Sequence, residues 1–245
     1  MVRSDVLIIG AGPTGLVLAL WLTRLGVKVR IVDKTAEPGT TSRALAVQAR
    51  TLELYRQLDL ADTVVARGHK VPAVNLWVKG EPATRLPFEA IGSGLTPYSF
   101  LQIFPQDQHE QLLIERLEAL GISVERRTEL LSFADEESRV IANLRGPDGH
   151  EERCEANYIA GCDGARSTVR ETLGTGFPGG TYRQIFYVAD VEATRCSSTA
   201  TAARSALARV VLPEPVPPAT RMLRPSATAS ARTFATIGVM ISAAT

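Results

Sequence analysis

The clearest pattern of apolar and polar positions in the chain lies at its N-terminus. A short apolar run at residues 6–9 stops at Gly10, and an apolar run with helical spacing extends over residues 16–25. Residues 27–31 then alternate between apolar and basic side chains before the acidic Asp33. These runs predict a strand, a tight turn, a helix and a second strand that ends on a carboxylate.

The pattern after the second strand predicts further helices with one β-rich interruption. Apolar residues recur at helical spacing from Leu45 to Leu60, which predicts a helix there. Residues 71–88 hold short β-like pieces that glycine and proline interrupt. Asp107 and Glu110 have the spacing of a capping box, so a second long helix is expected from residue 107 until Gly121.

Strand-like segments dominate the next part of the chain. Short apolar runs at residues 122–124 and 130–133 precede a predicted hairpin over residues 140–154. The run from Tyr158 to Gly161 predicts a buried strand, and Asp163 follows it. An acid at the carboxyl end of a strand lies where open α/β sheets bind ligands, although an isolated Asp-Gly is more often a simple turn. We therefore expect an α/β fold with a mainly parallel central sheet and a β-meander.

The turn after the first strand has the residue types of a dinucleotide-binding turn. Gly10 permits a sharp turn, Gly12 lets the backbone approach a diphosphate, and Gly15 lets the helix pack closely on the strand. Pro13 is tolerated in the first helical turn, where free N–H groups and the helix dipole face the diphosphate. Asp33, about 20 residues further on, is placed to accept hydrogen bonds from a ribose diol. A glycine-rich turn of another kind explains neither Pro13 nor Asp33.

Two other polar residues are candidates for contact with such a ligand. Arg43 lies in the loop before the helix expected from Leu45, although a lone loop arginine is more often solvated. Gln106 directly precedes the helix expected at residue 107, where its amide either faces a cofactor or is only a polar residue before the cap. The sequence alone leaves both alternatives open.

Composition narrows the class of protein. A formal net charge of +1 over 245 residues does not favour nucleic-acid binding. Cys154, Cys162 and Cys196 lack metal or disulfide spacing and are expected to be free thiols in a reducing compartment. No apolar segment has membrane-spanning length, and the four apolar residues before Gly10 are too few for a signal peptide. We expect a cytoplasmic protein.

The composition changes sharply near Arg195. Residues 1–195 contain 22 Lys or Arg and 25 Asp or Glu, whereas residues 196–245 contain five Arg, one acid and no Lys. The last stretch is rich in Ala, Ser, Thr and Pro and has little periodicity. Such a segment buries too little apolar surface to offset the entropy of ordering it, so we expect it to be poorly ordered.

Four segments together carry a resemblance to a known family. Gly10–Gly15, Ser42-Arg43-Ala44, Pro105-Gln106 and Gly161–Ser167 resemble, in order and spacing, the single-component flavoprotein aromatic hydroxylases typified by para-hydroxybenzoate hydroxylase. The resemblance covers about residues 1–194. It implies a Rossmann-like FAD-binding domain at residues 1–175, from which residues 72–101 depart to join a substrate domain. Residues 176–195 would begin the β-sheet of that domain, and residues 196–245 would form the atypical tail.

The resemblance also implies a reaction and a set of cofactor-binding residues. NAD(P)H reduces the bound FAD, which forms a flavin hydroperoxide with O2 and hydroxylates an aromatic, phenolic small molecule. We name no catalytic acid or base, no metal ligand and no oligomeric state, and expect neither nucleic acid nor membrane as partner. The residues expected to bind the cofactor are Gly10, Gly12, Pro13, Thr14, Gly15, Asp33, Lys34, Arg43, Gln106, Asp163 and Gly164.

The sequence departs from the family after Arg195. The hydroxylases carry a later Gly-Asp motif and a His-Pro stretch that hold the flavin ring, and nothing similar follows here. We therefore expect an incomplete second domain and a truncated or frame-shifted chain. One alternative is a catalytically inactive fragment that binds FAD or an adenine nucleotide. A short-chain dehydrogenase is a weaker alternative, because none of the five tyrosines is followed four residues later by Lys.

Overall fold

The computed structural model describes residues 3–39, 46–78, 81–88 and 92–180. The chain divides into two compact units, one of Met1–Pro72 and Phe88–Gly180 and the other of Ala73–Pro87 and Thr181–Thr245. Each unit is described by itself. No helix in the described ranges is long and apolar enough to cross a membrane.

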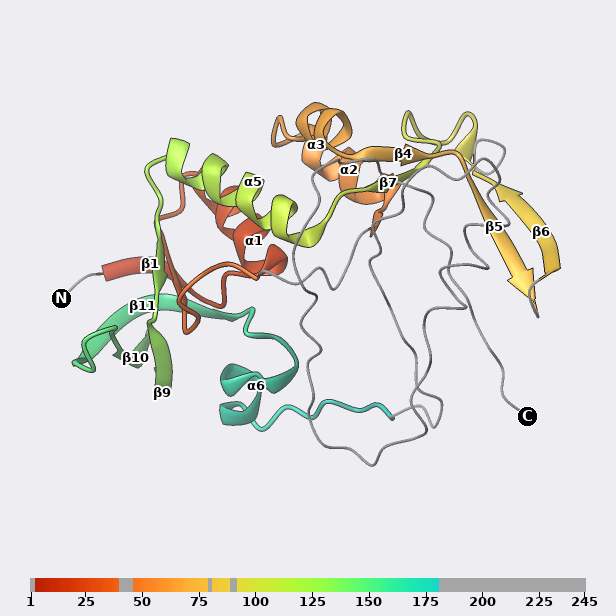
Figure 1. Ribbon diagram of the computed structural model, residues 1–245. Helices are drawn as coiled ribbons and strands as arrows, with labels where there is room; N and C mark the ends of the chain where they lie inside the picture. The colour runs from red at the N-terminus through yellow and green to blue at the C-terminus, as the bar shows by residue number, and fades with distance from the viewer. Residues whose placement is uncertain (1–2, 40–45, 79–80, 89–91, 181–245) are drawn as a thin grey trace, which may run out of the picture. The chain divides into compact units, whose positions relative to one another are not determined.

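A six-stranded sheet forms the centre of the first unit (Figure 1). Its first strands are all parallel: β1 pairs with β2 on one side and β11 on the other, and β8 extends the sheet beside β2. The strands β10 and β9 continue the sheet beyond β11 in antiparallel fashion, as a meander. In spatial order the strands are β8 (Val124–Arg126), β2 (Val29–Asp33), β1 (Arg3–Ile9), β11 (Glu151–Gly161), β10 (Arg139–Arg145) and β9 (Glu129–Glu136). The expected mainly parallel sheet with a β-meander is confirmed.

Helices cover one face of the parallel strands. Because successive side chains of a strand point to opposite faces, Ile8 of β1 and Ile31 of β2 lie on this face, against Leu16 and Leu113. Figure 1 shows α1 and α5 side by side here, and the two helices are in contact. The helices of this layer are α1 (Pro13–Arg24) and α5 (Gln106–Ala119), while α2 (Ala49–Arg56) and α3 (Ala61–Arg67) add side chains to the same hydrophobic core.

The opposite face of the sheet has its own core. Leu7 and Ile9 of β1 pack with Leu144 of β10, Leu130 of β9 and Val169. Val169 belongs to α6 (Thr168–Thr172), a short helix that follows the 3-10 turn η1 (Gly164–Arg166). Residues on both faces of β1 are therefore buried, which explains its nearly continuous apolar run.

Three smaller strands and a hairpin complete the described structure. In the first unit, β3 (Ala46–Val47), β7 (Leu101–Ile103) and β4 (His69–Val71) form a small antiparallel sheet. In the second unit, β5 (Ala73–Val78) and β6 (Glu81–Pro87) form an antiparallel hairpin. The expected contribution of residues 72–101 to a substrate domain stays a prediction, as does the boundary at residue 175. The tail expected at 196–245 lies outside the described residues.

Three local predictions are wrong. The helix expected from Leu45 to Leu60 is interrupted: α2 ends at Arg56, and α3 begins at Ala61. Asp59 between them has a φ of 57°, a left-handed conformation that a right-handed helix cannot include. The residues flanking it, Leu58 and Leu60, are buried, so the apolar spacing reflects a turn packed into the core.

The strand expected over Tyr158–Gly161 is present as the end of β11, but it is only partly buried: Ile159 and Ala160 are half-buried, and Tyr158 and Gly161 are exposed. Strand β10 begins its pairing with β11 at Ala156, so the later residues have a strand neighbour only in β1. Tyr158 is accordingly 70% exposed. The last wrong prediction is the capping box. The cap of α5 is Pro105 and not Asp107, Gln106 is already the first residue of the helix, and no side chain caps it.

Candidate functional site

The carboxyl ends of the parallel strands bring the two glycine motifs together. Ile9, Asp33 and Gly161 end β1, β2 and β11, which run in the same direction, so these ends meet at one edge of the sheet. The backbone N–H of Cys162 donates a hydrogen bond to the Ile9 carbonyl at 2.7 Å. A Cβ atom at Gly10, whose φ is +101°, would lie 2.4 Å from the Cys162 carbonyl oxygen. Only glycine fits between the two motifs.

The turn of the first motif leaves open space at the N-terminus of α1. Gly12 is the N-cap of α1, and no side chain caps the helix. A Cβ atom at Gly12 would meet nothing within 4 Å, whereas one at Gly15 would lie 1.9 Å from the Gly10 carbonyl oxygen. Pro13 has no N–H, and helix geometry leaves those of Thr14 and Gly15 without intrahelical acceptors. This cradle of N–H groups at a positive helix end fits an anionic diphosphate.

The carboxylate of Asp33 stabilises the glycine turn through hydrogen bonds. One oxygen, Oδ2, accepts the backbone N–H of Ala11 at 2.6 Å, and Oδ1 accepts the N–H and hydroxyl of Thr35 at 2.8 and 2.6 Å. Burial by itself would raise the pKa of Asp33, but these hydrogen bonds and the charge of Arg126 outweigh it and lower the pKa below its usual 3.8. The side chain is 13% exposed and ionised, so it can accept a further hydrogen bond from a ribose diol.

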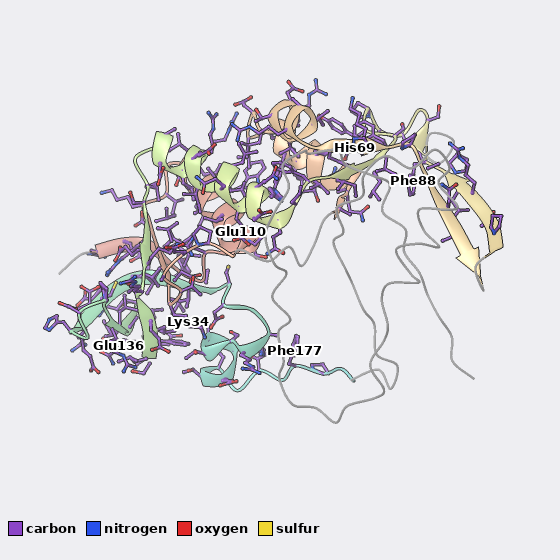
Figure 2. The ribbon with its side chains drawn as sticks, in the orientation of Figure 1. Lys34, His69, Phe88, Glu110, Glu136 and Phe177 are labelled. Atoms are coloured by element: carbon purple, nitrogen blue, oxygen red, sulfur yellow. The ribbon has the colours of Figure 1, made fainter. Side chains whose placement is uncertain are left out.

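Arg126 was not among the residues singled out from the sequence. It lies on β8 in register with Asp33, and its Nη1 atom is 3.7 Å from Oδ1 of Asp33 and 3.2 Å from Oγ1 of Thr35. Arg126 lies two residues beyond the strand expected at residues 122–124, and the sequence does not say that this strand is a neighbour of the one that ends at Asp33. Lys34, between Asp33 and Thr35, is exposed (Figure 2).

The second motif contributes one unsatisfied acceptor. Oδ2 of Asp163 accepts the backbone N–H of Val169 at 3.3 Å, while Oδ1 is buried without a hydrogen-bond partner. A buried carboxylate oxygen normally has a donor, so Oδ1 is suited to a hydroxyl or amide of a bound cofactor. Gly164 has a φ of +80°, which turns the chain away from the sheet edge. Burial, followed by the charge of Asp163, raises the pKa of the Cys162 thiol, so the thiol is inert at neutral pH.

The loop after β2 is tied to α5. Glu110, which is 4% exposed, accepts the backbone N–H of Gly39 at 3.1 Å and the side-chain amide of Gln106 at 2.7 Å. Gln106 is thus held close to Gly39 of the loop that starts after Asp33. Arg43, further along this loop, lies outside the described residues.

The orphaned oxygen of Asp163, the open space at Gly12 and the free N–H groups of α1 fit a dinucleotide such as FAD. Among the described residues, no group of three or more His, Cys, Asp or Glu is placed to hold a metal ion.

Comparison with known proteins identifies the family. The sequence profile of the family described as "FAD binding domain" matches residues 3–241. The chain is 45% identical over 170 residues to 6-methylpretetramide 4-monooxygenase of Streptomyces rimosus, which covers 69% of this chain and 30% of that protein.

Solved structures give the same result. The p-nitrophenol 4-monooxygenase PnpA of Pseudomonas putida DLL-E4 matches with a TM-score of 0.70 and 25% identity, over 74% of this chain and 46% of that one. Aklavinone-11 hydroxylase, solved in complex with FAD and aklavinone, matches with a TM-score of 0.64 and 34% identity, over 70% of this chain and 35% of that one. The chain spans 30–41% of the length of the first curated relatives it matches. The chain therefore belongs to the FAD binding domain family, and the relatives that it matches within this family are named as monooxygenases and hydroxylases.

Proposed function

We propose that this protein is an FAD-dependent monooxygenase that uses NAD(P)H and O2 to hydroxylate an aromatic, phenolic small molecule. The observation that carries the proposal is that the two glycine motifs meet at one edge of the sheet. There the backbone N–H of Cys162 donates a hydrogen bond to the Ile9 carbonyl. The relatives named above support the aromatic class of substrate, since one is named for p-nitrophenol and the others for 6-methylpretetramide and aklavinone.

In this proposal the chain binds and orients the cofactor. The N–H groups at the start of α1 hold the diphosphate, and Asp33 accepts the hydroxyls of the adenosine ribose. Asp163 supplies its orphaned oxygen as a further acceptor, and Gly164 permits the turn beside it. Lys34, Arg43 and Gln106 are proposed along the same cofactor. When bound, FAD supplies the redox chemistry that joins the oxidation of NAD(P)H to the activation of O2.

The visible absorption spectrum of the purified 245-residue protein, after incubation with FAD and desalting, tests the first half of this proposal. We expect retained flavin absorbance. The control is Gly12→Ala, whose methyl group would occupy the open space at the start of α1. A folded wild-type protein that retains no flavin would contradict the proposal.

Consumption of O2 and NAD(P)H in the presence of candidate phenols tests the second half. A second candidate function is binding of FAD without catalysis, which is favoured by the fact that the site features of the described residues, at Gly12, Asp33 and Asp163, all serve cofactor binding. Retained flavin with NAD(P)H oxidation and a hydroxylated phenol supports the enzyme. Retained flavin that NAD(P)H never reduces supports binding without catalysis.

The cellular location of the protein also stays a prediction. A cytoplasmic location is expected from the unpaired cysteines, and Cys154 and Cys162 are free thiols in the structure. Cell fractionation with an antibody against the protein tests that location.

A further inference from the structure

Glu110 is the only buried carboxylate in the part of the chain that the structure describes. Its side chain lies on α5 (Figure 2). The residue is 4% exposed. Removing a carboxyl group from water is unfavourable unless hydrogen bonds within the protein replace those that it made to water. A carboxylate at such a position therefore requires strong donors on both oxygens.

Both oxygens of Glu110 have a donor. Oε1 accepts the side-chain amide of Gln106 at 2.7 Å, and Oε2 accepts the backbone N–H of Gly39 at 3.1 Å. Gln106 and Glu110 are four residues apart and thus on the same side of α5, one turn from each other. Gly39, by contrast, is 71 residues away in the sequence, in the loop that follows Asp33.

The hydrogen bond to Glu110 relates to how the Gln106 amide is oriented. Its amide nitrogen donates to Oε1 of Glu110, so its carbonyl oxygen faces away from Glu110. Rotating the amide by 180° would exchange its donor and acceptor ends and break this hydrogen bond. Glu110 therefore favours one of the two orientations and at the same time holds Gly39 against α5.

We propose that Glu110 is a positioning residue for the cofactor. It holds the amide of Gln106 and the backbone at Gly39, in the loop after β2, in one arrangement before FAD binds. The inference rests on the proposed function, because it takes Gln106 to contact FAD. Preorganising a binding group increases affinity, because the ordering entropy is not lost on binding.

The test is the dissociation constant for FAD, measured by quenching of flavin fluorescence, in the full 245-residue chain. Glu110→Gln keeps one acceptor but places an NH2 group against either Gly39 or Gln106. We expect it to weaken FAD binding by roughly tenfold or more, the size expected when a charge-assisted hydrogen bond is lost. The matched control is Glu118→Gln, the same substitution at an exposed position of the same helix, expected to change affinity by less than about twofold.

A double-mutant cycle separates positioning from a merely structural role. If Glu110 acts through Gln106, then E110Q should cost much less FAD affinity in a Gln106→Ala background than in the wild type. Hydrogen exchange of the Gly39 amide, measured without FAD, should accelerate by roughly tenfold in E110Q and not in E118Q. Additive effects of E110Q and Q106A on affinity would overturn the proposal.

The failure of this inference differs from the failure of the proposed function. Wild-type protein that binds no FAD refutes both. Wild-type protein that binds FAD, with E110Q binding equally well, refutes only the positioning role. Should E110Q fail to fold, Glu110→Asp takes its place: the shorter carboxylate cannot reach both partners, so several-fold weaker binding is expected and wild-type affinity would overturn the inference.

Discussion

Acidification should destabilise the protein through a single buried histidine. His109 lies on α5 and is 9% exposed, with its Nε2 atom 2.8 Å from the hydroxyl of Tyr55 and its ring beside that of Phe104. Burial lowers the pKa of His109 from 6.5 to about 4. The same burial raises the pKa of the Tyr55 hydroxyl, which therefore stays protonated and offers no charge to a histidinium.

The sign of the effect follows from proton linkage. The unfolded chain protonates His109 below pH 6.5, whereas the folded chain does so only below about pH 4. The unfolded state therefore binds more protons between these values, and stability falls as the pH falls through this window. From these two pKa values, the loss relative to pH 7.5 is about 2 kcal/mol at pH 5 and about 3 kcal/mol at pH 4.

The assay is urea unfolding followed by circular dichroism at pH 7.5 and pH 5. His109→Gln keeps a hydrogen-bonding side chain for Tyr55 but does not titrate, so it should lose about 2 kcal/mol less than the wild type between these two pH values. All other titrating groups are shared by the two proteins, and their contributions cancel in the difference. An identical pH dependence in wild type and H109Q would refute the reasoning.

Further predictions concern the sheet edge. Gly15→Ala should destabilise the fold by about 3 kcal/mol or more in urea unfolding, because its Cβ atom would lie 1.9 Å from the Gly10 carbonyl oxygen. Gly12→Ala should leave stability within about 0.5 kcal/mol but prevent FAD retention on desalting, since its Cβ atom enters open space at the helix end; unchanged retention would contradict this assignment. Asp33→Asn should cost about 1–3 kcal/mol in the same unfolding assay at pH 7, because the ionised acceptor of the Ala11 and Thr35 N–H groups is lost. Because the pKa of Asp33 is lowered, its contribution is present above pH 3.8 and is lost as the pH falls through the lower folded value, so the difference between D33N and wild type should shrink there.

The fold was predictable wherever the local pattern and the tertiary packing agree. Residues 6–33 combine an apolar run, a glycine turn, a periodic helix and an alternating strand, and the structure has β1, α1 and β2 there. At α2 the pattern misled, since Leu58 and Leu60 are buried by a turn and not by a continuous helix. The spacing of apolar residues indicates which side chains face the core. A turn packed against the same core can produce the same spacing as a continuous helix.

The candidate site was only partly predictable. The turn was predictable because glycine, which lacks a Cβ atom, itself indicates a close backbone approach or a special turn, as at Gly10, Gly12 and Gly15. The residue types of Arg126 and Glu110 do not reveal which groups these side chains contact. Glu110 was assigned to a capping box from its spacing, whereas its carboxylate in fact reaches Gly39 and Gln106.

The sequence by itself determined the dinucleotide-type turn, the acid that follows it and the family, because these depend on residue types at short spacing. Only the tertiary structure decided which distant groups meet. It joined Gly10 to Cys162 across more than 150 residues, placed Arg126 beside Asp33 and turned Glu110 toward the loop after β2. Strand order and helix packing set these contacts, and neither is encoded in the spacing of any one segment.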